Sequence, residues 1–121
     1  MLFDVITGIL SAFFLVFSLL YPFRRTFKRL GNISRARFHC IAGALLVLTV
    51  LLHINVKLLA PCFSPGFAAL VALILVAVTG VLKRRNRKSK FFHYSHIVFA
   101  VLFILAVLLH IVQQIMNLLI M

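Results

Sequence analysis

Residues 38–60 read FHCIAGALLVLTVLLHINVKLLA, an apolar segment that carries a histidine near its start and another in its second half. The pentapeptide Val50-Leu51-Leu52-His53-Ile54 within it occurs again as Val107-Leu108-Leu109-His110-Ile111. About 20 consecutive apolar residues cross a bilayer as a helix, so the segment predicts a transmembrane helix. Ionisable residues are rare inside such helices, which makes these histidines candidates for function.

The composition of the whole chain is that of a membrane protein. Of its 121 residues 64% are hydrophobic, and the mean hydropathy is +1.20, too apolar for a soluble domain of this size. Four apolar spans are expected at 2–22, 38–60, 65–82 and 92–118. We expect a single all-α domain, residues 1–121, in which these spans form an integral-membrane, up-down four-helix bundle. The first span has neither a basic leader nor a cleavage site, so we expect it to be a retained helix.

The basic residues predict the orientation of the chain. The net charge is +12, and twelve of the thirteen basic residues lie in the first and third connectors. The middle connector, residues 60–66, has none, so the positive-inside rule places both basic loops in the cytoplasm and both termini outside. We expect a bacterial inner membrane. We interpret the charge as an orientation signal that contacts anionic lipid, and expect no nucleic-acid partner.

Four of the five histidines form two pairs with the same spacing. His39 and His53 are fourteen residues apart, as are His96 and His110. Fourteen helical steps end about 40° short of four full turns, so each pair lies on nearly one face, ~21 Å apart along the axis. The second and fourth spans run in the same direction, because each follows a basic loop. If they face each other, His39 lies opposite His96 near the cytoplasm, and His53 lies opposite His110 nearer the outside.

Facing imidazoles on two helices suit a haem, whose iron takes two axial ligands on opposite sides of the ring. The chain has no CxxCH motif, so covalent c-type attachment is excluded and b-type haem is expected. Zinc fits less well, because it usually takes three or four protein ligands and each level offers two histidines. We therefore predict two stacked, non-covalent haem b groups enclosed by the bundle. The iron ligands would be His39, His96, His53 and His110, with no catalytic residue assigned.

Further residues are candidates for contacts with these haems. Gly43 follows His39 by one turn, where it would serve either porphyrin approach or helix packing. Lys57 would reach the outer haem's propionates or snorkel to the interface, and Arg37, with its neighbours in the first connector, would serve the inner haem. His93 has no partner fourteen residues on, so a surface role is favoured over a propionate contact. Small residues elsewhere are attributed first to helix packing, with room for haem as the second reading: Gly8, Ser11, Ala68, Ala69, Ala72 and Gly80.

The second and fourth spans are related by an internal repeat. A shift of 57 residues superposes both histidine pairs and the apolar residues around them. With the two His-x13-His spacings, Gly43, and a basic loop before each ligand helix, the chain resembles the di-haem transmembrane b-type cytochromes. These include the four-helix core of cytochrome b in bc complexes and the haem domain of ferric reductases and NADPH oxidases. The resemblance covers nearly the whole chain and implies a two-haem electron relay, but flavin and nicotinamide domains and a Pro-Glu-Trp-Tyr-like quinol motif are lacking.

The expected function is transmembrane electron transfer. The donor would be a quinol or a cytoplasmic reductant, and the acceptor extracytoplasmic: ferric iron, oxygen or superoxide, or a redox protein. Whether the chain is itself an oxidoreductase stays open, as does its state as a homodimer or part of a larger complex. One alternative is a haem-bearing membrane anchor of a quinone-linked oxidoreductase. Another is a histidine-lined transporter of metal or haem, which the lack of any acidic residue beyond Asp4 disfavours.

Overall fold

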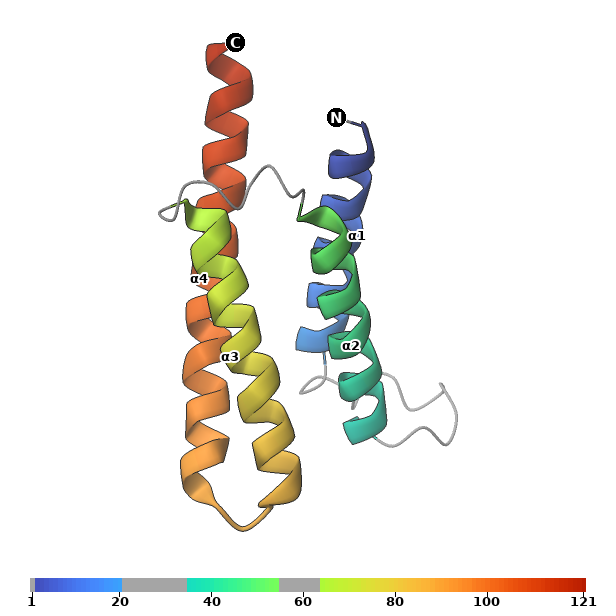
Figure 1. Ribbon diagram of the computed structural model, residues 1–121, viewed down its shortest axis with the longest axis vertical. Helices are drawn as coiled ribbons and strands as arrows, with labels where there is room; N and C mark the ends of the chain where they lie inside the picture. The colour runs from blue at the N-terminus through green and yellow to red at the C-terminus, as the bar shows by residue number, and fades with distance from the viewer. Residues whose placement is uncertain (1, 21–34, 55–63) are drawn as a thin grey trace. The chain divides into compact units, whose positions relative to one another are not determined.

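The computed structural model describes residues 2–20, 35–54 and 64–121, and all regular structure in them is helical (Figure 1). The four helices are α1 (Leu2–Leu19), α2 (Arg35–His53), α3 (Pro65–Arg85) and α4 (Lys90–Ile120). The all-α prediction is confirmed for these residues. α3 extends three residues beyond its predicted end at 82, and α4 extends beyond 92–118 at both ends. The predicted ends of the first two spans, at 22 and 60, lie outside the described residues.

Local sequence explains where α3 and α4 begin and end. Ser64 caps the start of α3 by accepting a hydrogen bond from the N–H of Phe67 at 3.2 Å, and Pro65 then occupies the first turn, where its missing N–H costs nothing. At the other end the N–H of Asn86 still bonds to the carbonyl of Leu82. The turn closes when the N–H of Ser89 donates to the carbonyl of Asn86 at 3.0 Å, and α4 follows at once.

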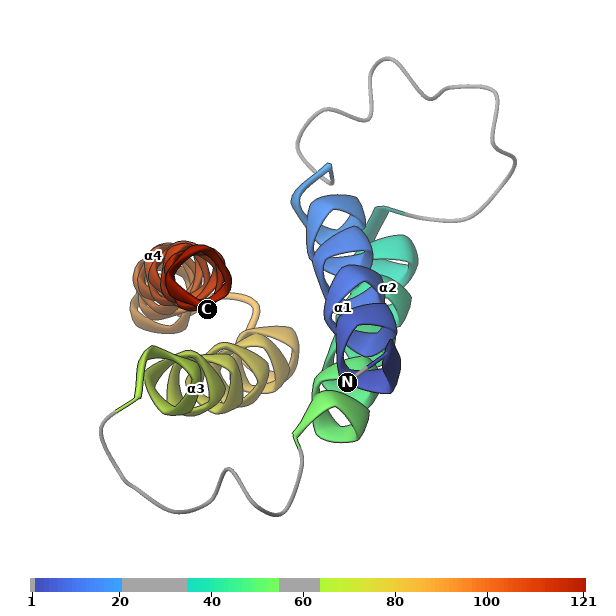
Figure 2. The ribbon, with the colours of Figure 1, turned by 90° about the horizontal axis from the view of Figure 1, so that it is seen from above.

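The chain divides into two compact units, residues 1–56 and 57–121. In the first unit α1 and α2 pack antiparallel (Figures 1 and 2). Ala42 and Leu46 of α2 are buried, as is Thr7 of α1. The rings of Phe17 and Phe38 join the two helices with centroids 6.1 Å apart.

The second unit is a hairpin of α3 and α4 joined by the turn at Asn86–Ser89 (Figure 1). Small side chains on α3, Ala69 and Ala72, are buried where the two helices meet, together with Leu73 of α3 and Phe103 of α4. In lipid, which is as apolar as the side chains, the hydrophobic effect does not drive helices together. Small residues then favour association because they let the helix backbones pack closely. For Ala69 and Ala72 the packing interpretation accounts for their burial.

All four helices are long and apolar enough to cross a membrane. Their mean hydropathies range from 1.7 to 2.6, yet at most 22% of the most apolar segment of any one is buried inside the protein. Leu, Ile, Val and Phe side chains instead cover the outer surface of both hairpins. Exposed apolar surface on this scale is compatible with an integral membrane protein, whose helices face hydrocarbon.

Candidate functional site

The four paired histidines all lie on α2 and α4, and each contacts the preceding helix of its own hairpin. His39 and His53 contact α1, and His96 and His110 contact α3. All four side chains are half-buried. Each imidazole is therefore held between two apolar helices.

His53 lies against a threonine and a glycine of α1. Its Nδ1 is 3.1 Å from the hydroxyl oxygen of Thr7, a residue only 4% exposed. That hydroxyl is also 2.9 Å from the carbonyl of Phe3 and 3.2 Å from that of Asp4, and carbonyls can only accept. When the hydroxyl donates its one hydrogen to these carbonyls, its lone pair faces His53, and Nδ1 of His53 is then the donor.

The neighbouring Gly8 lets this ring approach the backbone of α1. A Cβ atom placed on Gly8 would lie 3.3 Å from Cε1 of His53, closer than an ordinary contact. A methyl group there would require the imidazole to shift by a few tenths of an ångström. The interpretation of Gly8 as a residue of close packing is supported, with the histidine ring as what it packs against.

His96 has the same surroundings in the second unit. Its Nδ1 is 3.1 Å from the carbonyl of Val76 and 3.4 Å from the hydroxyl of Thr79. That hydroxyl donates to the carbonyl of Leu75 at 2.7 Å, so Nδ1 again carries the hydrogen. A Cβ on Gly80 would lie 3.2 Å from Cε1 of the ring. Threonine followed by glycine therefore holds one histidine in each hairpin.

The other two histidines are held by serine and by glycine. Nδ1 of His39 is 3.2 Å from the carbonyl of Ser18 and 3.3 Å from its hydroxyl. Since the carbonyl can only accept, Nδ1 of His39 is a donor as well. His110 lies over Gly66 in the first turn of α3, where a Cβ would be 3.1 Å from both Cε1 and Nδ1.

These contacts fix the chemical form of three imidazoles. A neutral imidazole that donates through Nδ1 carries its lone pair on Nε2. Metal-bound histidines usually have this arrangement, with the other ring nitrogen donating to a carbonyl or another acceptor that orients the ring. His39, His53 and His96 are thus held in the form that can ligate a metal through Nε2.

Gly43 differs from the other glycines of the site. A Cβ on Gly43 would meet no described atom within 4 Å, whereas Gly8, Gly66 and Gly80 each have a histidine ring in close contact. Packing within the α1–α2 hairpin therefore does not require a glycine at this position. A role for Gly43 in close approach by a porphyrin stays a prediction.

The remaining predicted residues are less informative. Arg37 lies exposed in the first turn of α2, and Lys57 falls outside the described residues. His93 is exposed, with its ring 5.6 Å from that of Tyr94, so it is a surface residue of α4. Among the described residues no three His, Cys, Asp or Glu side chains gather as a protein-only metal site would need.

Sequence reasoning missed Thr7, Ser18, Thr79 and Gly66, which contact the histidines. The available signal was the Thr-Gly dipeptide, present at Thr7-Gly8 and again at Thr79-Gly80. Comparison with known proteins gives no further guide, because no family model, curated protein or solved structure matches the chain.

Proposed function

We propose that the chain is a transmembrane electron-transfer protein of the di-haem b type. In this proposal His39 and His96 ligate one haem b, and His53 and His110 ligate a second, within a four-helix bundle that the two hairpins form. Electrons would pass from a quinol or a cytoplasmic donor to an acceptor outside. The observation that carries the proposal is the donation by Nδ1 in three of these histidines, which leaves the lone pair on Nε2.

The surroundings of the histidines fit a haem better than a bare ion. Each imidazole is half-buried between apolar helices, and no third protein ligand lies with any of them among the described residues. A porphyrin supplies four ring nitrogens itself and needs only two axial ligands and an apolar pocket. A Cβ on Gly43 would have no described atom within 4 Å, so the described part of the chain leaves room for a flat ring beside α2.

Helix continuity supports the proposed stacking. α2 runs without a break from Arg35 to His53, and α4 from Lys90 to Ile120. Within each helix the two histidines are therefore ~21 Å apart along the axis, a large part of the ~30 Å hydrocarbon thickness. When bound, haem would supply the one-electron chemistry. The chain would supply placement, orientation of the imidazoles through Thr7, Ser18 and Val76, and exclusion of water.

The test is an optical spectrum of the purified chain, with haem measured per polypeptide. The wild type should bind two haems and show low-spin, redox-active bands. His39→Ala and His53→Ala should each retain one, and His93→Ala, a histidine substitution outside the proposed sites, should retain two. A colourless protein produced with ample haem, or loss of haem in His93→Ala equal to that in His39→Ala, would refute the proposal.

A further inference from the structure

Positive charge is concentrated at the turn between α3 and α4. Six basic residues lie within eight positions, while residues 57–121 contain no acidic residue. No carboxylate side chain of this unit can therefore neutralise them. The six basic residues are Lys83, Arg84, Arg85, Arg87, Lys88 and Lys90.

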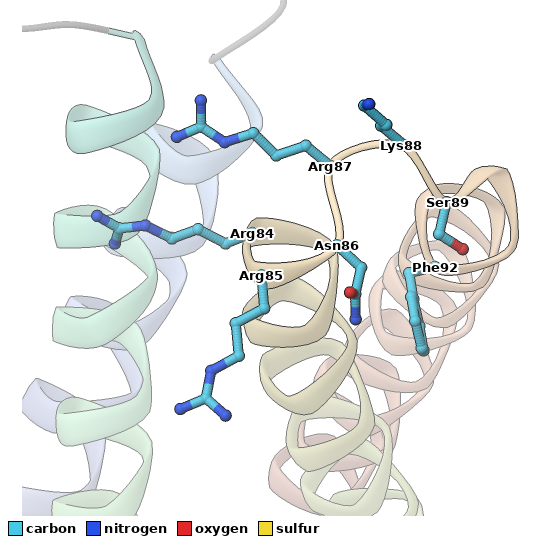
Figure 3. A pocket seen from close by; sticks show the side chains of 7 residues that line it. All are labelled: Arg84, Arg85, Asn86, Arg87, Lys88, Ser89 and Phe92. Carbon is cyan, nitrogen blue, oxygen red and sulfur yellow. The ribbon is translucent and has the colours of Figure 1, made fainter.

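These cations are not equivalent, because only some of them line an open hollow at the turn. The hollow has a volume of about 820 Å³, and Figure 3 shows the arginine side chains extending from the end of α3 and the turn, with Phe92 on the first turn of α4. Lys83 and Lys90 belong to the same part of the chain but do not line it. The residues that line the hollow include Arg84, Arg85, Arg87, Lys88, Ser89 and Phe92.

The length of the turn sets its depth in a membrane. Four residues, 86–89, separate α3 from α4, and hydrogen bonds from the N–H groups of Asn86 and Ser89 keep the chain compact there. Two spanning helices joined so closely hold their turn at the level of the lipid headgroups. Phe91 and Tyr94, 73% and 63% exposed, lie at the same end, and amphipathic aromatic rings such as tyrosine favour this interface.

We propose that this hollow is a binding site for the headgroup of an anionic phospholipid. Arginine guanidinium groups bind phosphate through paired hydrogen bonds, and three arginines line the hollow. Ser89 makes no side-chain hydrogen bond to cap α4, so its hydroxyl is not committed to that helix. Phe92 offers an apolar surface to the glycerol and upper acyl chain. A soluble anion would be matched only by the positive charges of the hollow. A phospholipid is matched by these charges, by the apolar ring of Phe92 and by the position of the turn at the level of the headgroups.

Lipid binding in this hollow does not require haem. It differs from a general electrostatic attraction between the basic turn and anionic lipids. The full chain in neutral detergent would be titrated with phosphatidylglycerol, phosphatidylcholine and inorganic phosphate, and bound lipid counted by native mass spectrometry. One phosphatidylglycerol should bind with preference over phosphatidylcholine. Millimolar inorganic phosphate should not displace it.

Two double variants with the same change of charge separate a site from diffuse electrostatics. Arg84→Gln/Arg87→Gln removes lining cations, and affinity for phosphatidylglycerol should fall at least about tenfold, the equivalent of one charged hydrogen bond or more. Lys83→Gln/Lys90→Gln removes two cations that do not line the hollow, and its affinity for phosphatidylglycerol should stay within about twofold of the wild type. Charges outside a site contribute little. Arg84→Lys/Arg87→Lys keeps the charge without the paired geometry and should give an intermediate loss.

Equal losses in the two glutamine variants would overturn the site. Displacement by inorganic phosphate would overturn the lipid as its ligand, and so would tighter binding of an oligonucleotide with the same dependence on Arg84 and Arg87. Circular dichroism of each variant checks that the helices are retained. If Arg84→Gln/Arg87→Gln does not fold, the arginine-to-lysine variant alone decides, and an affinity equal to the wild type would count against the site.

Discussion

The hydroxyl of Thr7 lies 3.1 Å from Nδ1 of His53, a residue 46 positions further along the chain. The same relationship joins Thr79 to His96 in the second hairpin, at 3.4 Å. In both cases the threonine donates its own hydrogen to a carbonyl of its helix. Each hairpin thus orients an imidazole with a hydroxyl that is itself oriented by the backbone.

Thr7→Val is expected to disturb His53 without changing the shape of the side chain. Nδ1 of His53 would lose this acceptor, and the loss of one hydrogen bond typically costs about 0.5–1.5 kcal/mol of folding free energy. On the proposed function, weaker donation from Nδ1 makes Nε2 a poorer ligand, so the reduction potential of the haem that His53 holds should rise. Redox titration followed optically measures this.

Thr7→Ser is the matched control, because it keeps the hydroxyl. It should restore the potential of the wild type, even if the lost methyl group lowers stability slightly. An identical shift in Thr7→Val and Thr7→Ser would assign the effect to packing and would contradict a role for the hydrogen bond.

Glycine-to-alanine substitutions should separate the two kinds of glycine. Gly66→Ala places a Cβ 3.1 Å from the ring of His110, and overpacking of this kind typically costs about 1–3 kcal/mol. Gly43→Ala meets no described atom, so the hairpin should keep its stability while haem binding falls. Thermal unfolding in detergent, followed by circular dichroism on the haem-free protein, measures the first effect, and haem per chain the second.

The opposite pattern would count against the site. If Gly43→Ala destabilises the haem-free chain as much as Gly66→Ala does, Gly43 serves packing. If Gly43→Ala binds two haems with wild-type affinity, no porphyrin lies beside it.

The predicted orientation can be tested by cysteine labelling in a background with Cys40 and Cys62 replaced by serine. Lys88→Cys, in the exposed turn after α3, should react with a membrane-impermeant maleimide in inverted vesicles and not in intact cells. Met121→Cys, exposed at the end of the chain, should show the reverse. Labelling of Lys88→Cys from outside the cell would overturn the positive-inside assignment.

The helices were predictable because apolar length alone identifies a spanning segment. Basic residues lengthen α2 and α4 at their starts and α3 at its end, whereas α4 runs past its expected end through Leu119 and Ile120. The fourteen-residue spacing of the histidines was also visible, since helical periodicity fixes which residues share a face. Periodicity does not give the rotation of that face about a neighbour. For this reason the contacts of His39 with Ser18 and of His110 with Gly66 could not be foreseen.

The contacts of serine and threonine side chains with the histidines could not be predicted from the sequence either. Serine and threonine in apolar helices commonly bond to a carbonyl of the preceding turn, as Ser11 does with Thr7 at 2.8 Å, and so attract no attention. Only the fold distinguishes Ser11 from Thr7, whose lone pair faces a histidine. The pairing of histidines between the two hairpins stays a prediction.

α4 is longer than a helix needs to be to cross a bilayer. Thirty-one residues span about 46 Å, and even a tilt of 40° would leave a vertical extent of about 35 Å, more than the ~30 Å of hydrocarbon. If α4 crosses a bilayer with Lys90 at one surface, its last turn, where Leu118, Leu119 and Ile120 are exposed, extends into the opposite headgroup layer. In that hydrated layer these apolar side chains would favour contact with another apolar surface.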